Sequence, residues 1–247
     1  MLDLIYPPNI YCIYCGKPID KRFPYSLCPT CANTIRWANK TNCIKCGTPM
    51  WEMKHTISSL CSNCRIRRKS FDGGFTCTGY GFLEKELIHF FKYGDRSYLA
   101  WSLGDLMYER IENEINRPDM IVPVPMYKRK ERRRGYNQAG LLAKAISKRM
   151  HIPYYSHLLI RTKDTTPMNK LNAKEREENV QSVFKAADWV QNTIYGTTIL
   201  LIDDVLTTGN TADACSKVLK SKGAHKVYVL TFAAGMDINR DYIETIG

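Results

Sequence analysis

The sequence of 247 residues contains no long apolar stretch. No segment approaches the roughly 18 consecutive apolar residues of a membrane-spanning helix, which argues against an integral membrane protein. The first residues also lack the basic segment and the long apolar core of a secretory signal. With 44% hydrophobic and 24% charged residues, the composition is that of an ordinary globular protein. We therefore expect a cytoplasmic protein without a membrane span.

Acidic residues are scarce in the first part of the chain. Residues 1–70 hold 11 Lys and Arg against 3 Asp and Glu, whereas residues 71–247 hold 25 against 21. Taken alone, this excess of positive charge is typical of a segment that binds nucleic acid. Part of it lies in the basic run Arg65, Arg67, Arg68 and Lys69, which a solvated face or a docking surface would explain equally well.

The sequence has 10 cysteines, although a reducing cytoplasm disfavours disulfides. Eight of them form four C-x-x-C pairs, a spacing with which one tight turn presents two sulfurs to a tetrahedral ion at about 2.3 Å. Two pairs complete one closed site, so the sequence predicts two structural Zn²⁺ ions whose charge partly offsets the thiolates. The predicted ligands are Cys12, Cys15, Cys28, Cys31, Cys43, Cys46, Cys61 and Cys64.

An internal repeat indicates how the cysteine pairs combine. Residues 12–18 (CIYCGKP) recur as residues 43–49 (CIKCGTP), and a plainer pair follows each copy. The repeat predicts two successive zinc ribbons, each built from adjacent pairs, while an interleaved pairing stays open at this point. Gly16 and Gly47 occupy a turn position that commonly needs positive φ. The unpaired Cys77 and Cys215 are expected to be buried.

A turn-forming cluster at residues 71–74 marks the predicted boundary between a cysteine-rich domain, residues 1–70, and a larger domain, residues 71–247. Apolar strands are predicted at about 75–82, 120–124, 153–159, 181–186, 198–202 and 226–232, and helices at about 83–93, 96–116, 137–150 and 211–222. Such alternation predicts an α/β fold, in which helices cover both faces of a mostly parallel sheet. Ligands of these sheets lie beyond the carboxyl ends of the strands.

Residues 199–211 (ILLIDDVLTTGNT) join one of these strands to the helix that follows it. Asp203 and Asp204 end the strand, where carboxylates can accept hydrogen bonds from the two vicinal hydroxyls of a ribose. The free N–H groups and the positive dipole end of the next helix suit a phosphate dianion. We call the turn between them the phosphate loop; it consists of Thr207, Thr208, Gly209, Asn210 and Thr211. Acids and loop together predict a ribose 5-phosphate site.

Two acids can merely end a strand and Thr-Thr-Gly can merely cap a helix, but adjacent acids repel each other and cost stability without a ligand. The segment resembles the phosphoribosyl pyrophosphate signature of the type I phosphoribosyltransferases. The resemblance implies their fold and a site for phosphoribosyl pyrophosphate together with Mg²⁺. In the hypoxanthine-guanine branch an aspartate usually stands where this chain has Thr207, so salvage of those purines is disfavoured.

Nearly the whole chain is similar to the ComF family of competence proteins. Besides the cysteine pairs and the acidic loop, the resemblance is carried by FKYGD at 91–95, VPVP at 122–125, RGYNQA at 134–139 and REENV at 176–180. It implies a late competence protein in which a double zinc ribbon precedes a phosphoribosyltransferase-like domain. It also implies a role in DNA uptake during natural transformation, with the DNA-uptake machinery as a partner.

The resemblance implies roles for the residues after the strand at 120–124. Met126, Tyr127 and Lys128 would form the pyrophosphate-binding loop, and residues 132–138 a mobile loop that closes over the ligand. Lys128, Arg132 and Arg134 would assist catalysis by offsetting the charge of the departing pyrophosphate. A solvated flexible loop, or phosphate contacts with single-stranded DNA, would explain the same basic residues.

Arg161 and residues 165–179 lie where the family's enzymes select the acceptor, and they contain no aromatic side chain to stack on a base. The sequence therefore identifies no acceptor and no oligomeric state, and leaves open whether the chain is an enzyme.

Three functions compete. The first is a ComF-type protein that binds phosphoribosyl pyrophosphate and acts in DNA uptake, with single-stranded DNA as a further ligand. The second is a Mg²⁺-dependent phosphoribosyltransferase of nucleotide metabolism, and the third a non-catalytic DNA-binding scaffold. The acidic pair argues against the third, and the missing base-binding groups argue against the second.

Overall fold

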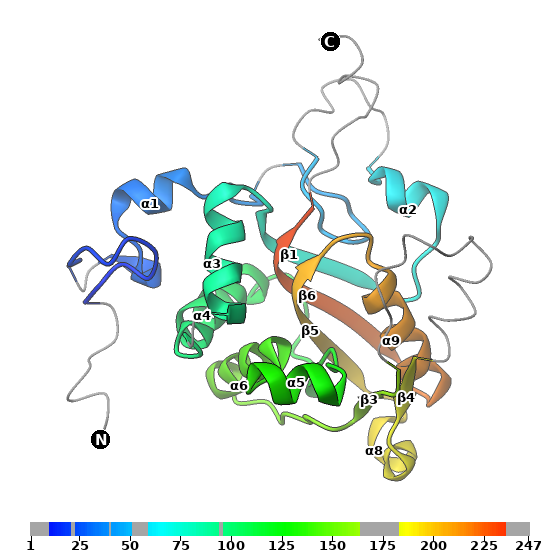
Figure 1. Ribbon diagram of the computed structural model, residues 1–247. Coiled ribbons are helices and arrows are strands. Elements are labelled where there is room, and N and C mark those ends of the chain that lie inside the picture. The colour runs from blue at the N-terminus through cyan, green and yellow to red at the C-terminus, as the bar shows by residue number, and fades with distance from the viewer. Residues whose placement is uncertain are drawn as a thin grey trace.

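The computed structural model describes residues 10–20, 23–39, 41–50, 59–93, 96–163 and 183–235. A parallel sheet of four strands forms its centre (Figure 1). The strands are β1 (Gly73–Gly79), β2 (Met120–Pro123), β5 (Thr198–Leu206) and β6 (Lys226–Ala234). In the sheet they follow the order β1-β6-β5-β2. Their near-continuous apolar sequences are explained by burial on both faces.

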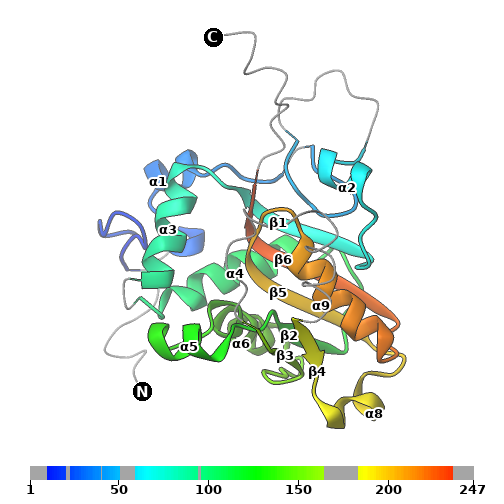
Figure 2. The same ribbon diagram turned by 45° about the vertical axis from the view of Figure 1, so that its right-hand side comes forward.

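Helices cover both faces of this sheet (Figures 1 and 2). One face packs against α3 (Phe82–Tyr93), α4 (Leu99–Ile111) and α6 (Gln138–Met150), and the other against α9 (Asn210–Ser221). The buried residues recur at helical spacing, as with Leu83, Leu87 and Phe91 in α3. The predicted fold class, an α/β protein with a mostly parallel sheet between helices, is confirmed.

The remaining elements are short. They are η2 (Pro24–Ser26), α1 (Pro29–Thr34), α2 (Ser62–Ile66), α5 (Lys128–Arg134), β3 (Leu159–Arg161), β4 (Phe184–Ala186), η3 (Asp188–Val190) and α8 (Gln191–Ile194). β3 and β4 form a separate antiparallel pair. None of the helices in the described part of the chain is long and apolar enough to span a membrane.

The core is divided by the sheet into two clusters of buried side chains. Along β5, Leu200 and Ile202 belong to the cluster under α3, α4 and α6, whereas Ile199 and Leu201 belong to the cluster under α9. This alternation is the ordinary period of a strand, in which successive side chains point to opposite faces. The alternation changes phase at the polar end of β5, where the two predicted acids lie, because Val205 packs against the cluster under α3, α4 and α6 and Leu206 belongs to the cluster under α9.

Several predicted elements differ from the observed ones. Gly73 and Gly74, predicted as part of a boundary turn, begin β1 instead. Residue 74 must be a glycine there, because an added Cβ would lie 2.7 Å from Cys46 O in the backbone of the second ribbon. The strand predicted at 153–159 is reduced to a single bridge between Tyr154 and Ile121, followed by β3. Cys77 and Cys215 are buried, as predicted. Residues 94 and 95 and the segment 165–179 lie outside the described residues, and the domain boundary at residue 70 stays a prediction.

The predicted mobile loop at 132–138 is also wrong in its first part. Residues 128–134 (KRKERRR) form α5, and only the turn at 135–137 separates it from α6. Lys, Arg and Glu are good helix formers, and charge density alone does not prevent a short helix. Gly135 ends α5 with φ of 86°, the left-handed conformation that glycine adopts at helix ends.

Candidate functional site

The eight cysteines of the C-x-x-C pairs gather into two groups. The first cluster contains Cys12, Cys15, Cys28 and Cys31, and the second contains Cys43, Cys46, Cys61 and Cys64. Within each cluster all four sulfurs lie within 4.8 Å of one another. This is the sequential pairing that the repeat predicted, and it rules out the interleaved one. Gly16 and Gly47 have φ of 71° and 73°, as predicted for these turns.

Both clusters fit zinc. Four sulfurs at about 2.3 Å from one ion stand roughly 3.8 Å apart in a tetrahedron. The sulfurs of Cys15 and Cys28 are 3.7 Å apart, and those of Cys46 and Cys61 are 3.5 Å apart. Thr48 Oγ1 lies 3.1 Å from Cys46 Sγ, where its hydroxyl can donate to a thiolate. Each set supplies four ligands and leaves no open position, so the sites are structural.

The two clusters belong to opposite sides of the sheet. Cysteines of the first cluster pack in the core with α3, α4 and α6, whereas those of the second pack in the core with α9. Figures 1 and 2 show the same separation, with α1 beside α3 and α2 on the side of α9. The two copies of the repeat therefore have different neighbours.

The acidic pair lies near the end of β5. Asp203 and Asp204 are consecutive and face helices on opposite sides of the sheet, since burial and then the negative charge of Asp203 raise the pKa of Cys215 on α9, whereas Asp204 faces α3. Asp204 Oδ2 forms an ion pair of 2.7 Å with Lys92 Nζ at the end of α3. Burial, followed by the negative charge of Asp204, raises the pKa of the Asp203 carboxyl well above its ordinary range. Lys92 was not among the predicted site residues, although it lies in the FKYGD segment.

The phosphate loop connects β5 to α9. Gly209 is the N-cap of α9 with φ of 71°, a backbone conformation that favours glycine. Because glycine has no side chain to cap the helix, the N–H groups of the first turn stay available to an anion. Thr207, Thr208 and Thr211 are exposed, so their hydroxyls can add donors. This geometry suits a phosphate.

A second residue that the motifs did not reveal lies against this loop. Lys69 Nζ donates hydrogen bonds to Thr208 O at 2.9 Å and to Asn210 Oδ1 at 3.0 Å. Only the position of Lys69 in the basic run could have drawn attention to it, and the run does not distinguish it from its neighbours.

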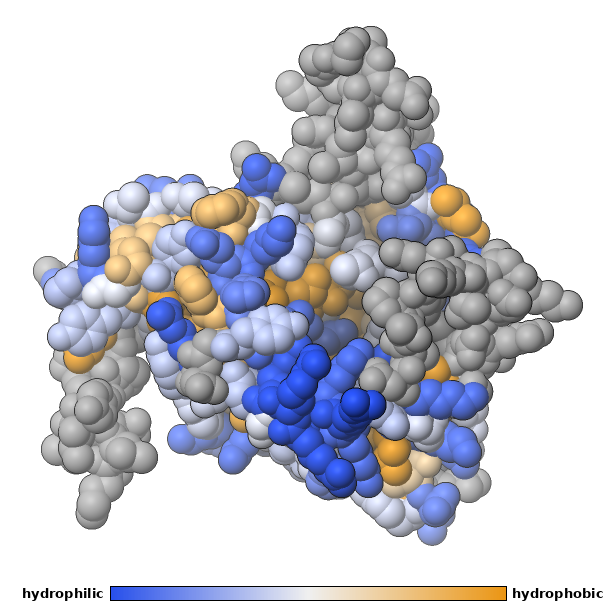
Figure 3. All heavy atoms as spheres, viewed as in Figure 1, coloured by the Kyte–Doolittle hydropathy of each residue, from blue (hydrophilic) through white to orange (hydrophobic). Residues whose placement is uncertain are grey.

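The residues predicted to bind pyrophosphate follow β2, the strand beside β5. Met126 and Tyr127 are partly exposed, and Tyr127 is the N-cap of α5. Lys128 and Arg132 lie exposed on that helix. Figure 3 shows a strongly hydrophilic surface where α5 lies.

Arg134 is held at the end of α3. Its Nη1 donates to Gln138 Oε1 at 2.5 Å, and its Nη2 donates to the hydroxyl of Tyr93 at 3.1 Å. Tyr136 fastens the same turn by donating to Phe91 O at 2.6 Å. Gln138 is buried, and its Nε2 has no hydrogen-bond partner among the described residues. Since Tyr93 follows Lys92 in the chain, the contacts of Arg134 lie close to Lys92, which pairs with Asp204.

The connections after β5 and β2 lead in opposite directions. The chain leaves β5 through α9 and returns to β6, whereas the chain after β2 passes α5 and α6 to Tyr154, which bridges the far side of β2. In open α/β sheets such a reversal of strand order is where ligands bind. The acidic pair, the phosphate loop and residues 126–128 all lie at this edge.

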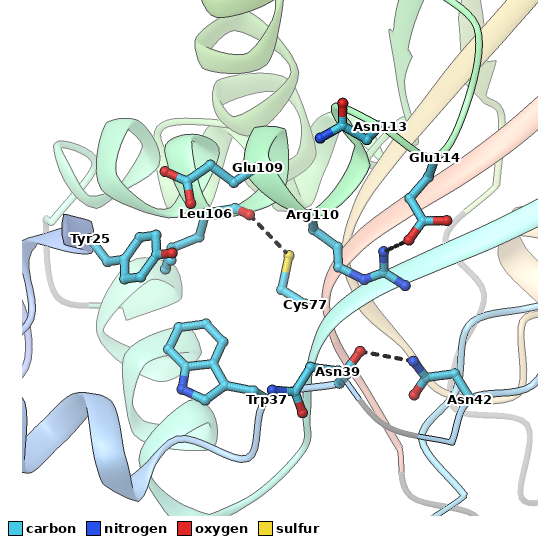
Figure 4. Close-up of a pocket in the computed structure, with 11 residues that line it drawn as sticks. Tyr25, Trp37, Asn39, Asn42, Cys77, Leu106, Glu109, Arg110, Asn113 and Glu114 are labelled. Carbon is cyan, nitrogen blue, oxygen red and sulfur yellow. Dashed lines mark hydrogen bonds and ion pairs between the residues drawn. The ribbon is translucent and has the colours of Figure 1, made fainter.

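A hollow of about 660 Å³ lies elsewhere, between α4 and the segment after α1 (Figure 4). Its lining comprises Tyr25, Trp37, Ala38, Asn39, Asn42, Cys77, Leu106, Glu109, Arg110, Asn113 and Glu114. A hydrogen bond to Glu109 raises the pKa of Tyr25, and Glu114 pairs with Arg110 at 2.7 Å. None of the predicted site residues lines this hollow, so it is separate from the edge that carries the acidic pair.

Comparisons with known proteins match nearly the whole chain. Residues 1–79 match the family model described as a double zinc ribbon domain. The chain is 30% identical over 228 residues to competence protein F of Haemophilus influenzae, covering 90% of this chain and 95% of that protein. It is 30% identical over 224 residues to DNA utilization protein YhgH of Escherichia coli, covering 88% and 94%. A solved structure, glutamine phosphoribosylpyrophosphate amidotransferase from B. subtilis, matches with a TM-score of 0.40 and 19% identity, covering 57% of this chain and 29% of that one.

Proposed function

The chain belongs to the ComF family of competence proteins, and from this premise we propose that it binds phosphoribosyl pyrophosphate at the β5–β2 edge and acts in DNA uptake during natural transformation. The observation that supports this ligand is the acidic pair beside a helix N-terminus that no side chain caps, with Gly209 in the left-handed conformation. The names of the two relatives, a competence protein and a DNA utilization protein, support the proposed role in DNA uptake. We place the protein in the cytoplasm, where the cysteine clusters stay reduced.

Each part of the ligand has residues of suitable chemistry. The phosphate loop binds the 5-phosphate, and Asp203 and Asp204 accept hydrogen bonds from the ribose hydroxyls. Residues 126–128 bind the pyrophosphate, and Arg132 and Arg134 offset its charge. Mg²⁺ would arrive with the pyrophosphate, since phosphate and carboxylate oxygens are the ligands that it prefers. This assignment covers the donor of a transfer reaction and names no acceptor.

Calorimetric titration of phosphoribosyl pyrophosphate with Mg²⁺ tests the site. Wild type is expected to bind in the micromolar range, and the double variant Asp203→Asn/Asp204→Asn is expected to lose binding. Asp105→Asn is the matched control, because Asp105 lies exposed on α4 in a 3.6 Å pair with Arg149. If wild type does not bind phosphoribosyl pyrophosphate, the proposed ligand is rejected. The alternative of a phosphoribosyltransferase of nucleotide metabolism is then rejected as well. Unchanged binding by the double variant would refute the assignment of the acids.

Single-stranded DNA is the second ligand that we propose, on the surface of α5. Six of the seven residues of this helix are Lys or Arg, and none is buried. The Arg134 guanidinium lies 4.9 Å from the centre of the Tyr93 ring, a combination of cation and aromatic that suits bases and phosphates.

Fluorescence anisotropy with a labelled oligonucleotide tests this surface. Affinity should fall steeply with salt, with a logarithmic slope of about −0.7 for each phosphate contact. Replacing Arg129 and Arg133 by Gln should lower both affinity and slope, because both side chains are exposed and lie outside the proposed pyrophosphate site. Binding that does not respond to salt would contradict this electrostatic mechanism.

A further inference from the structure

We propose that Lys69 is a positioning residue of the phosphate loop, and that through it phosphate binding depends on the second cysteine cluster far more than on the first. The inference rests on the proposed function, since it assumes that the loop binds a phosphate. It concerns a residue that belongs to no recognised part of the motif.

Burial distinguishes Lys69 from the rest of its basic run. Arg65, Arg67 and Arg68 are exposed, whereas Lys69 is only 5% exposed. Its side chain passes Gly209, where an added Cβ would lie 3.6 Å from Lys69 Cε, and its ammonium bonds Thr208 and Asn210 on either side. A charged group that could have stayed in water is instead held inside the loop.

This placement is electrostatically unfavourable for the ligand-free loop. A cation at a helix N-terminus opposes the helix dipole, and a buried charge costs free energy unless it is paired. Among the described residues Lys69 has two neutral oxygen acceptors and no carboxylate partner. The nearby Asp213 instead accepts a hydrogen bond from Ser70 N at 2.5 Å and faces Lys217 at 3.4 Å. A phosphate dianion in the loop would supply the missing negative charge.

Lys69 also decides which end of the Asn210 amide faces the ligand. An ammonium only donates, so Asn210 must turn Oδ1 toward Lys69. Its NH₂ group then faces away from Lys69 and is available to a phosphate oxygen. The lysine therefore orients a donor as well as supplying charge.

The second cluster holds the segment that carries Lys69. Phe71 is fully buried in the same core as the cysteines of that cluster. The backbone of the ribbon rests directly on β1, since an added Cβ at Gly47 would lie 2.6 Å from Gly74 O. The Asp72 carboxylate accepts a hydrogen bond from Val227 N and forms an ion pair with Lys220 Nζ, each at 2.7 Å. The first cluster packs on the opposite face, and within the described part of the chain it has no such connection to the loop.

Calorimetric titration with ribose 5-phosphate tests the lysine. Lys69→Met should weaken binding about 10- to 100-fold, the range expected for loss of a charge-assisted contact. Arg68→Met is the matched control, because Arg68 is adjacent and exposed, and its affinity should stay within about twofold of wild type. Thermal unfolding of both variants shows whether they fold.

The pH profile separates positioning from mere support. A phosphate monoester loses its second proton at a pKa of about 6, so wild type should bind more tightly at pH 7.5 than at pH 5.5. If Lys69 favours the dianion, the ratio of the affinity at pH 7.5 to the affinity at pH 5.5 should be smaller in Lys69→Met than in wild type. A purely structural defect would weaken binding equally at both pH values. An unchanged ratio would overturn the proposed role.

The cysteine variants test the connection to zinc. Cys64→Ser should weaken ribose 5-phosphate binding at least tenfold more than Cys31→Ser, the matching change in the first cluster. Equal losses would overturn the selective coupling. If wild type itself fails to bind, the proposed function fails as well; if wild type binds and Lys69→Met binds equally, only this inference fails.

Discussion

Replacing Asp203 by Asn is expected to stabilise the ligand-free protein, whereas the same replacement at Asp204 is expected to destabilise it. The two residues are neighbours of the same chemistry, but they face opposite sides of the sheet, Asp203 toward α9 and Asp204 toward α3. Asp203 carries a charge that burial and Asp204 both disfavour. Asp204 has a cationic partner in Lys92, 2.7 Å away. Opposite effects from adjacent, identical substitutions would be hard to obtain in any other way.

The contacts set the size of each effect. Asp203 accepts a hydrogen bond from Asp204 N at 2.9 Å, and after burial and the charge of Asp204 a hydrogen bond between the two carboxyl groups also raises its pKa. Because the Asp203 side chain is only partly buried, we expect a gain of about 1 kcal/mol, the lower end of the range of about 1–3 for an under-partnered buried group. Breaking a buried ion pair costs about 3–5 kcal/mol, and an exposed one about 0–1. The side chains of Lys92 and Asp204 are 25% and 14% exposed, so Asp204→Asn should cost about 1–3 kcal/mol.

The gain from Asp203→Asn should depend on pH. Because the folded pKa of Asp203 lies above its ordinary value of 3.8, ionised Asp203 opposes folding at neutral pH, and this opposition fades as the pH falls toward 3.8. The gain should therefore be present at pH 7.5 and smaller at pH 5.

Differential scanning calorimetry of zinc-saturated wild type and both variants measures these effects. A change of 1 kcal/mol should move Tm by about 2–4 °C in a chain of this size. Differences between variant and wild type at each pH cancel the contribution of the cysteine clusters. Shifts of the same sign for both variants would refute the reasoning from opposite faces.

Three further predictions concern the cysteines and glycines. Metal analysis should find close to two zinc ions per chain, and a value near one would reject one of the two clusters. Gly47→Ala should destabilise the protein by about 3 kcal/mol and Gly16→Ala by about 1 kcal/mol, because both residues need positive φ but only Gly47 touches Gly74. Denaturant titration measures both losses. Equal losses would contradict the packing of the second ribbon against β1. Cys77, whose pKa burial raises to about 12, should resist thiol reagents at pH 8 until the protein unfolds, and prompt labelling of the zinc-loaded native protein at this residue would show that it is accessible.

The cysteine pairing and the acidic loop could be predicted because they depend on short spacings. Two residues between cysteines define a turn whatever surrounds it, and the repeat indicated which pairs belong together. In the same way an apolar strand followed by Asp203, Asp204 and a Thr-Thr-Gly turn specifies a strand end and a helix start. The prediction was wrong for residues 132–134, which the family resemblance assigned to a mobile loop and which form the end of α5.

By itself, therefore, the sequence determined the two cysteine sets that fit zinc, the α/β class of the larger part and the position of the acidic pair at the end of a strand. Only the tertiary structure decided that the two ribbons lie on opposite faces of the sheet, that Lys92 pairs with Asp204, and that one lysine of a basic run enters the phosphate loop. Lys69 and Thr208 are 139 residues apart in the chain. Their contact depends on how the second ribbon packs against β1 and α9, and such packing is set by the combined fit of many side chains.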